Sequence, residues 1–539
     1  MMRALRSLAA LLFVAGCGGS ATQAPAAQGT TPAGVTKVEV QPATKQPPPA
    51  SGERRDVKFP AIARATTGSG LELNTVQIDT LPIVRIRLVV RSGSSSDPQG
   101  QPGVASLTAA MLKEGTLKKS SAKLAEAVDF LGASLTVGSD EDTLAIDFQA
   151  LSEHFDTALD LVAEVALQPS FAQDELDKLK KRELARLSLQ SQDPHFLAAR
   201  EFRKALYGAH PYAHIDTTEA VVKKIKRDDL KRWHKRAFVP GNAFLVVAGN
   251  VSADRVKAAA ERAFGKWTGK VTPEVAPPAP PVAATRSVYI VDRPESVQSM
   301  IYFGNLALPR SDAGFIPLTV ANQVLGGSAA SRMFMDLRER QSLTYGAYSD
   351  VDEGLVPVPF RAFAAVRNEV TAQAMKAFVH HLERISSEPV PAAELADAKR
   401  LLIDSFPLHI ETPGEIAALV SELRTYGFPD NYWDGFRAEI QAVTADQALA
   451  AAKKYIQPNK ALIVVVGKAA AVKPFLDPYG PVKVLDVEGK VVVEDVKAQQ
   501  PPVAGAATAT PVASPAPAPQ PSAQPPAAAT PVAPAAAKP

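Results

Sequence analysis

Cysteine is almost absent from this chain of 539 residues, which has one, at position 17. A single cysteine excludes a disulfide framework, a cysteine-based zinc ribbon and an iron–sulfur cluster. No apolar run reaches the roughly 18–20 residues of a membrane-spanning helix. The 59 Lys and Arg residues nearly balance the 56 Asp and Glu residues, whereas nucleic-acid-binding proteins usually carry a concentrated basic excess. A Gly-rich phosphate loop is also lacking, which argues against a nucleotide site.

The lone cysteine ends a segment typical of secretory signals. Two arginines precede the apolar run 8–14, and the sequence Val-Ala-Gly-Cys at 14–17 resembles a bacterial lipobox. This resemblance implies that residues 1–17 form a lipoprotein signal, with cleavage before Cys17 and lipidation of Cys17. The alternative is an ordinary signal peptide with an incidental cysteine. Gly18, rather than an aspartate, favours outer-membrane delivery, so we expect a lipid-anchored protein of the cell envelope that faces the periplasm.

Proline is unevenly distributed along the chain. Residues 18–55 and 500–539 are rich in Ala and Pro and have too few large apolar side chains to form a core. We expect the first stretch to be a semi-extended tether. The second should be a disordered tail with polyproline II character.

The segment between these stretches contains an internal repeat. At a single offset of 218 positions and without gaps, Pro240 aligns with Pro458 and Gly249 aligns with Gly467. Each copy has a helix, a proline turn and a β-branched strand that a glycine closes. Two generic helix–turn–strand units could agree by chance, but agreement over more than twenty positions favours a duplication. We therefore divide the body into halves at 56–270 and 286–499, joined by a Pro-rich linker at 271–285.

Periodicity within the first half alternates between strand and helix patterns. We expect helices at 104–113, 122–131, 152–167 and 171–191, and a β-hairpin within 135–150. This mixture without a nucleotide-binding loop predicts an α+β fold.

The body resembles the insulinase/pitrilysin family of metallopeptidases, which includes processing peptidases built from a catalytic and a zinc-less subunit. The matching stretches are residues 91–98, 103–116, 193–194, 205–212 and 240–249 in the first half, and 298–304, 324–333 and 337–345 in the second. The resemblance implies two similar halves, each a mainly antiparallel sheet with helices, that form a clamshell.

Catalysis in the family requires His-x-x-Glu-His on the first helix, where two histidines one turn apart bind zinc and the glutamate activates water. Ser106, Ala109 and Ala110 occupy those positions here. A hydroxyl and two methyl groups can neither bind zinc nor accept a proton from water. The third ligand would be a glutamate, and Glu183 lies near its position, although the expected position is closer to Arg186. We therefore expect no catalytic residue, no metal and no other cofactor.

The histidines elsewhere offer no clear replacement. None lies within residues 1–130, so a shifted alignment does not restore the motif. His210 and His214 are four residues apart, but Pro211 argues against the helix that would align them. A metal role for this pair is an alternative to the structural role that the family's His-Pro-Tyr turn implies for His210.

One functional element of the family is retained. The resemblance implies that Arg338 and Tyr345, seven residues apart, bind substrate, because the family uses such a pair to hold the peptide near the zinc. Alternatively, Arg338 faces solvent beside Glu339 and Tyr345 packs against its helix. Gln341-Ser342 stands where the family usually has a Lys/Gly-type pair, so the sequence leaves the local geometry between Arg338 and Tyr345 open.

Three functions are compatible with these observations. The first is a non-catalytic lipoprotein subunit that pairs with a zinc-bearing paralogue and helps to bind and cleave peptides. The second is a stand-alone scaffold that binds peptides or unfolded polypeptides. An active zinc metalloendopeptidase is the least favoured. In each case we expect a peptide substrate, membrane attachment through the lipid anchor and no binding of nucleic acid.

Overall fold

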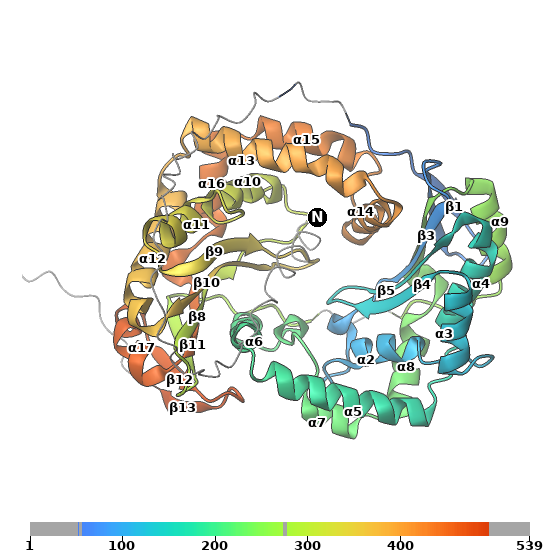
Figure 1. Ribbon diagram of the computed structural model, residues 1–539, viewed down its shortest axis with the longest axis horizontal. Coiled ribbons are helices and arrows are strands. Elements are labelled where there is room, and N and C mark those ends of the chain that lie inside the picture. Colours follow the sequence, from blue (N-terminus) through green and yellow to red (C-terminus); the bar gives the residue numbers. More distant parts are fainter. Residues whose placement is uncertain (1–51, 53–56, 273–276, 495–539) are drawn as a thin grey trace, which may run out of the picture. The chain divides into compact units, whose positions relative to one another are not determined.

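The computed structural model describes residues 52, 57–272 and 277–494. The predicted signal with Cys17, the predicted tail and nearly all of the predicted tether lie outside these residues. The described residues form two β-sheets covered by helices (Figure 1). The strands of the first sheet are, in spatial order, β1 (Ala63–Thr66), β2 (Glu72–Gln77), β6 (Ala243–Gly249), β3 (Ile83–Val90), β5 (Leu144–Leu151) and β4 (Ser134–Ser139). Those of the second are β13 (Val491–Glu494), β12 (Val482–Leu485), β7 (Ser287–Asp292), β11 (Leu462–Gly467), β8 (Gln298–Leu306), β10 (Pro359–Arg367) and β9 (Thr344–Val351).

The two sheets share one topology. The order β2-β6-β3-β5-β4 in the first corresponds to β7-β11-β8-β10-β9 in the second. In both sheets the first of these pairs is parallel and the next three are antiparallel. The repeated prolines each begin a short 3-10 turn before β6 and β11, and the repeated glycines end those strands. The predicted α+β fold with two duplicated halves is therefore confirmed.

Strand β6 is buried along its whole length because both faces of its sheet are covered. Successive side chains of a strand point to opposite faces. Leu245 and Val247 belong to one hydrophobic core, whereas Phe244, Val246 and Ala248 belong to the other. On the first side the sheet packs against helices α4 (Phe155–Leu167) and α9 (Ala253–Phe264). This arrangement explains the uninterrupted apolar sequence of the strand.

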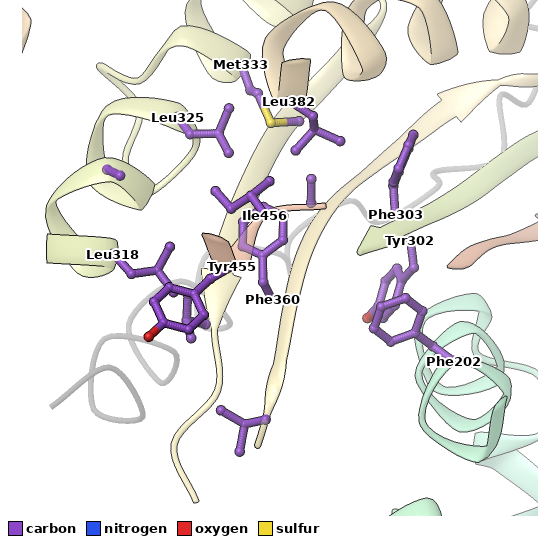
Figure 2. Close-up of a cluster of buried hydrophobic side chains, with 14 of the residues drawn as sticks. Phe202, Tyr302, Phe303, Leu318, Leu325, Met333, Phe360, Leu382, Tyr455 and Ile456 are labelled. Carbon is purple, nitrogen blue, oxygen red and sulfur yellow. The ribbon is translucent and has the colours of Figure 1, made fainter. Parts of the chain in front are cut away.

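Each sheet also packs against a helix from the other half of the chain. Helix α6 (Pro194–Tyr207) lies against β8 and β11, and helix α14 (Pro413–Tyr426) lies against β3 and β6 (Figure 1). Figure 2 shows Phe202 of α6 beside Tyr302 of β8; their ring centroids are 5.8 Å apart at 82°. Full burial of one such aromatic side chain contributes about 2–3 kcal/mol. One of the two hydrophobic cores therefore contains side chains from both halves of the chain.

The remaining helices are distributed over both halves of the chain. Those of the first half are α2 (Val104–Leu112), α3 (Ser121–Phe130), α5 (Gln173–Gln190), α7 (Glu219–Lys224) and α8 (Arg227–Ala237). Those of the second half are α10 (Phe315–Leu325), α11 (Arg332–Phe334), α12 (Thr371–Ser387), α13 (Ala392–Ser405), α15 (Tyr432–Ala442), α16 (Ala445–Tyr455) and α17 (Ala469–Leu476). The predicted helices and hairpin of the first half are confirmed, with ends that differ by a few residues. Among the described residues, no helix combines the length and the apolar character needed to cross a membrane.

Candidate functional site

A pocket of about 300 Å³ lies where helices α2 and α5 meet a segment that follows α6. Ser106 and Ala110, two of the three degenerate motif positions, line this pocket together with both candidates for the third ligand. The complete lining is Ser106, Leu107, Ala110, Glu183, Arg186, Ile215, Asp216 and Thr217. The structure thus brings these four positions to one site. Ala109 faces the core instead and is almost completely buried.

The start of α2 is fixed by Asp97 and Gly103. The carboxylate of Asp97 accepts hydrogen bonds from the backbone N–H groups of Gly103 (2.6 Å) and Ala105 (2.7 Å), and so satisfies donors that a helix start leaves unpaired. Gly103 has a φ of 92°, and a Cβ at this position would lie 2.9 Å from Thr217 Cα. Only glycine allows this close approach. The approach holds α2 against the segment that closes the pocket.

The side chains at this site do not fit the zinc ion that the family resemblance implies. The Ser106 hydroxyl lies 3.0 Å from the hydroxyl of Ser139 at the end of β4, and the other two positions carry methyl groups. Within residues 52, 57–272 and 277–494, no three His, Cys, Asp or Glu side chains form a group that could hold a metal ion. Helix α2 therefore provides neither a zinc ligand nor a general base.

His210 stabilises the turn in which it lies. Its Nδ1 accepts a hydrogen bond from the backbone N–H of Tyr212 at 3.1 Å, and its ring stacks on Tyr207. Burial lowers the pKa of His210, with a further contribution from Arg203. His214, the other half of the alternative metal pair, is exposed. These contacts agree with the structural role that the family's turn implied for His210.

A guanidinium group lies in the pocket where the third ligand was expected. Arg186 Nε donates to Glu183 Oε2 at 2.6 Å, and Nη1 donates to Gln190 Oε1 at 2.7 Å. Nη1 and Nη2 also donate to the two carboxylate oxygens of Asp216, at 2.6 Å and 2.9 Å. Hydrogen bonds to Asp216 and then to Glu183 raise the pKa of Arg186 above its ordinary value. Each of the three guanidinium nitrogens thus has an oxygen partner.

Comparisons with known proteins show the family to which this fold belongs. Residues 75–213 match the family model described as "Insulinase (Peptidase family M16)", and residues 224–402 match the model described as "Peptidase M16 inactive domain". The crystal structure of a peptidase M16 inactive domain from Pseudomonas fluorescens has 30% sequence identity to this chain and a TM-score of 0.70. The match covers 76% of this chain and 98% of that one. The chain belongs to the insulinase family.

Curated relatives in this family carry two kinds of name. The "Non-peptidase homolog YmxG" of Helicobacter pylori is 26% identical over 396 residues, which make up 72% of this chain and 89% of that protein. The "Uncharacterized zinc protease YmxG" of Bacillus subtilis is 25% identical over 361 residues, or 65% of this chain and 85% of that protein. The insulinase family therefore contains relatives named as proteases and at least one named as a non-peptidase.

The second predicted element of the insulinase fold, Arg338 and Tyr345, lies on a segment with irregular backbone. Residues Met335–Arg340 form a π-helix, a rare conformation that often occurs at functional sites. Arg338 is 48% exposed, lies 3.5 Å from Glu339 and covers the ring of Phe334. Tyr345 is 80% exposed at the start of β9, so it does not pack against its helix. Neither side chain is part of the lining of the α2 pocket, and their role in substrate binding stays a prediction.

Ser342, at the glycine position of the family's Lys/Gly-type pair, has an unusual backbone conformation. It has a φ of 51°, in the left-handed region that favours glycine. A non-glycine residue in this conformation costs about 1–2 kcal/mol. Such strain tends to cluster at functional sites. The segment between Arg338 and Tyr345 therefore keeps a glycine-type backbone although its side chain has changed.

Asp336 fixes the π-helix to its surroundings, a role that no sequence pattern indicated. Its Oδ2 accepts hydrogen bonds from His381 Nε2 of α12 (2.8 Å) and from Gln341 Nε2 (3.0 Å). Burial alone would raise the pKa of Asp336, but these hydrogen bonds lower it below its ordinary value.

The role of Asp216 in the α2 pocket was not predicted either, because Asp216 lies 30 residues from Arg186 and no local pattern connects the two. The spacing of Glu183, Arg186 and Gln190 on one helical face was the only available signal.

Proposed function

We propose that this chain is a non-catalytic, peptide-binding member of the insulinase family that works together with a zinc-bearing relative. The observation that carries the proposal is on helix α2, where Ser106, Ala109 and Ala110 occupy the positions of the family's two zinc-binding histidines and its glutamate base. The pocket itself lies where α2 and α5 meet the 215–217 segment. Because α2 lacks the zinc ligands and the base, the proposed role of this chain is to bind peptides rather than to cleave them.

Peptide binding is supported by the position of β4 beside the pocket. Strand β4 pairs only with β5 within the described part of the chain, so its other edge presents backbone donors and acceptors. Ser139, its last residue, lies next to Ser106 at the pocket. An extended peptide can add to such an edge through main-chain hydrogen bonds. This mode accepts varied sequences because the backbone makes the contacts.

Pairing with a zinc-bearing relative is supported by the exposure of Arg338 and Tyr345. A guanidinium and a phenol can donate hydrogen bonds to a peptide carbonyl or to the oxyanion that forms from it. In this chain they have no catalytic partner at the α2 pocket. A second subunit with an intact His-x-x-Glu-His would supply the zinc and the base, and this chain would supply additional donors.

Lipid attachment through Cys17 would place this activity at the cell envelope. The proposal follows from the lipobox-like sequence alone. Cys17→Ala should release the protein from the detergent phase or stop its processing, because no acyl chain could then be attached. Unchanged partitioning of this variant would rule out the anchor.

Affinity capture from solubilised membranes, followed by peptidase assays with and without a chelator, tests the pairing. We expect recovery of a zinc-bearing relative and cleavage that requires both chains. If the chain binds peptides without such a relative and no combination yields cleavage, the stand-alone scaffold takes the place of the paired subunit.

A further inference from the structure

The guanidinium of Arg186 is surrounded by oxygens in the way that a metal ion usually is. Glu183 and Gln190 from α5 each provide one oxygen, and Asp216 from the facing segment provides two, all within 2.6–2.9 Å of a guanidinium nitrogen. Glu183 and Asp216 are largely buried. Without a cation between them, their two negative charges would repel each other at reduced dielectric.

We propose that Arg186 replaces the family's metal ion as the permanent cation of this pocket. It joins α5 to the 215–217 segment, which in turn contacts the start of α2 at Gly103. A guanidinium stays protonated at all physiological pH values. It also cannot be removed by a chelator or exchanged for another ion. The walls of the pocket are thus held in place without a metal, and the same cation excludes a metal from the pocket.

This inference rests on the absence of catalysis that the proposed function assumes, but it makes a separate claim about metal binding. The exclusion has two physical causes. Three of the four carboxylate oxygens of Glu183 and Asp216 already accept hydrogen bonds from Arg186, and a second cation beside the guanidinium would be repelled. Restoring the two histidines of the motif should therefore be insufficient to restore a zinc site.

The test compares two variants of the full chain by titration with zinc alone. Ser106→His/Ala110→His keeps Arg186, whereas Ser106→His/Ala110→His/Arg186→Gln removes the guanidinium and frees both carboxylates. We expect the triple variant to bind about one zinc per chain and the double variant to bind it more weakly by about tenfold or more. Arg182→Gln in the double background is the matched control, because Arg182 lies one turn away on α5 and pairs with Glu114.

Equal zinc affinity of the double and triple variants would overturn the proposal, and so would a triple variant that is folded but binds no zinc. A second measurement covers the case in which these variants do not fold. Arg186→Gln alone should lower the midpoint of thermal unfolding, and adding Asp216→Asn should recover part of the loss, because it removes one of the unpaired charges. A role in packing alone predicts no recovery. Zinc titration and thermal unfolding require no peptide and no partner. A negative result in either measurement can therefore be distinguished from failure of the proposed function.

Discussion

Because α2 approaches the pocket wall closely at Gly103, we expect Gly103→Ala to destabilise the fold strongly. The added Cβ would lie 2.9 Å from Thr217 Cα and closer still to Thr217 Cβ, and the backbone φ is 92°. The left-handed conformation costs a non-glycine residue about 1–2 kcal/mol. Displacing a packed neighbour costs roughly another 1–3 kcal/mol. The free energy of unfolding should therefore fall by about 2–5 kcal/mol, and the pocket should change shape because α2 carries Ser106.

Gly100→Ala is the matched control for this prediction. Gly100 has a φ of 74°, but a Cβ there would meet no atom within 4 Å. This variant should show only the conformational cost of about 1–2 kcal/mol. Urea denaturation of both variants, followed by circular dichroism, measures the difference. Equal destabilisation would refute the close contact between α2 and the 215–217 segment.

Three further predictions concern other parts of the molecule. Ser342→Gly should raise the free energy of unfolding by about 1 kcal/mol, because glycine adopts the positive φ of this position without strain; a lower urea midpoint would contradict that explanation. Burial lowers the pKa of His234 to about 4, against about 6.5 in the unfolded chain. The unfolded state then takes up the proton first as the pH falls, so stability should drop by on the order of 3 kcal/mol between about pH 6.5 and 4. His234→Gln should flatten this part of the pH–stability curve, and an unchanged slope would contradict the assignment. In a mixture with the zinc-bearing relative, Arg338→Ala or Tyr345→Phe should lower turnover by about a hundredfold, since each removes one donor to the oxyanion. Size-exclusion chromatography should show normal assembly of both variants, and wild-type turnover would refute the shared site.

The fold could be predicted from local sequence patterns and from the repeat. Pro240 and Gly249 align with Pro458 and Gly467, and the strands that they bound occupy equivalent places in the two sheets. The packing of α6 on the second sheet could not be predicted. The amphipathic pattern of a helix indicates that one face is buried, but it does not indicate which sheet covers that face.

The candidate site was also predictable only in part: positions on one helix could be placed, but contacts between distant segments could not. Ser106 and Ala110 are one helical turn apart, so helical periodicity was enough to place them on the face that lines the pocket. The bond between Arg186 and Asp216 depends on how a distant segment folds back. The π-helix that contains Arg338 has no sequence pattern of its own, because its wider turn depends on contacts such as those of Asp336 with α12.

Metal analysis of the purified chain, combined with a peptidase assay, tests the central claim most directly. The α2 pocket has no zinc ligand on its helix and already holds a guanidinium. We therefore expect no stoichiometric zinc and no cleavage of peptides by the chain alone. About one zinc per chain, together with hydrolysis that a chelator abolishes, would contradict this account.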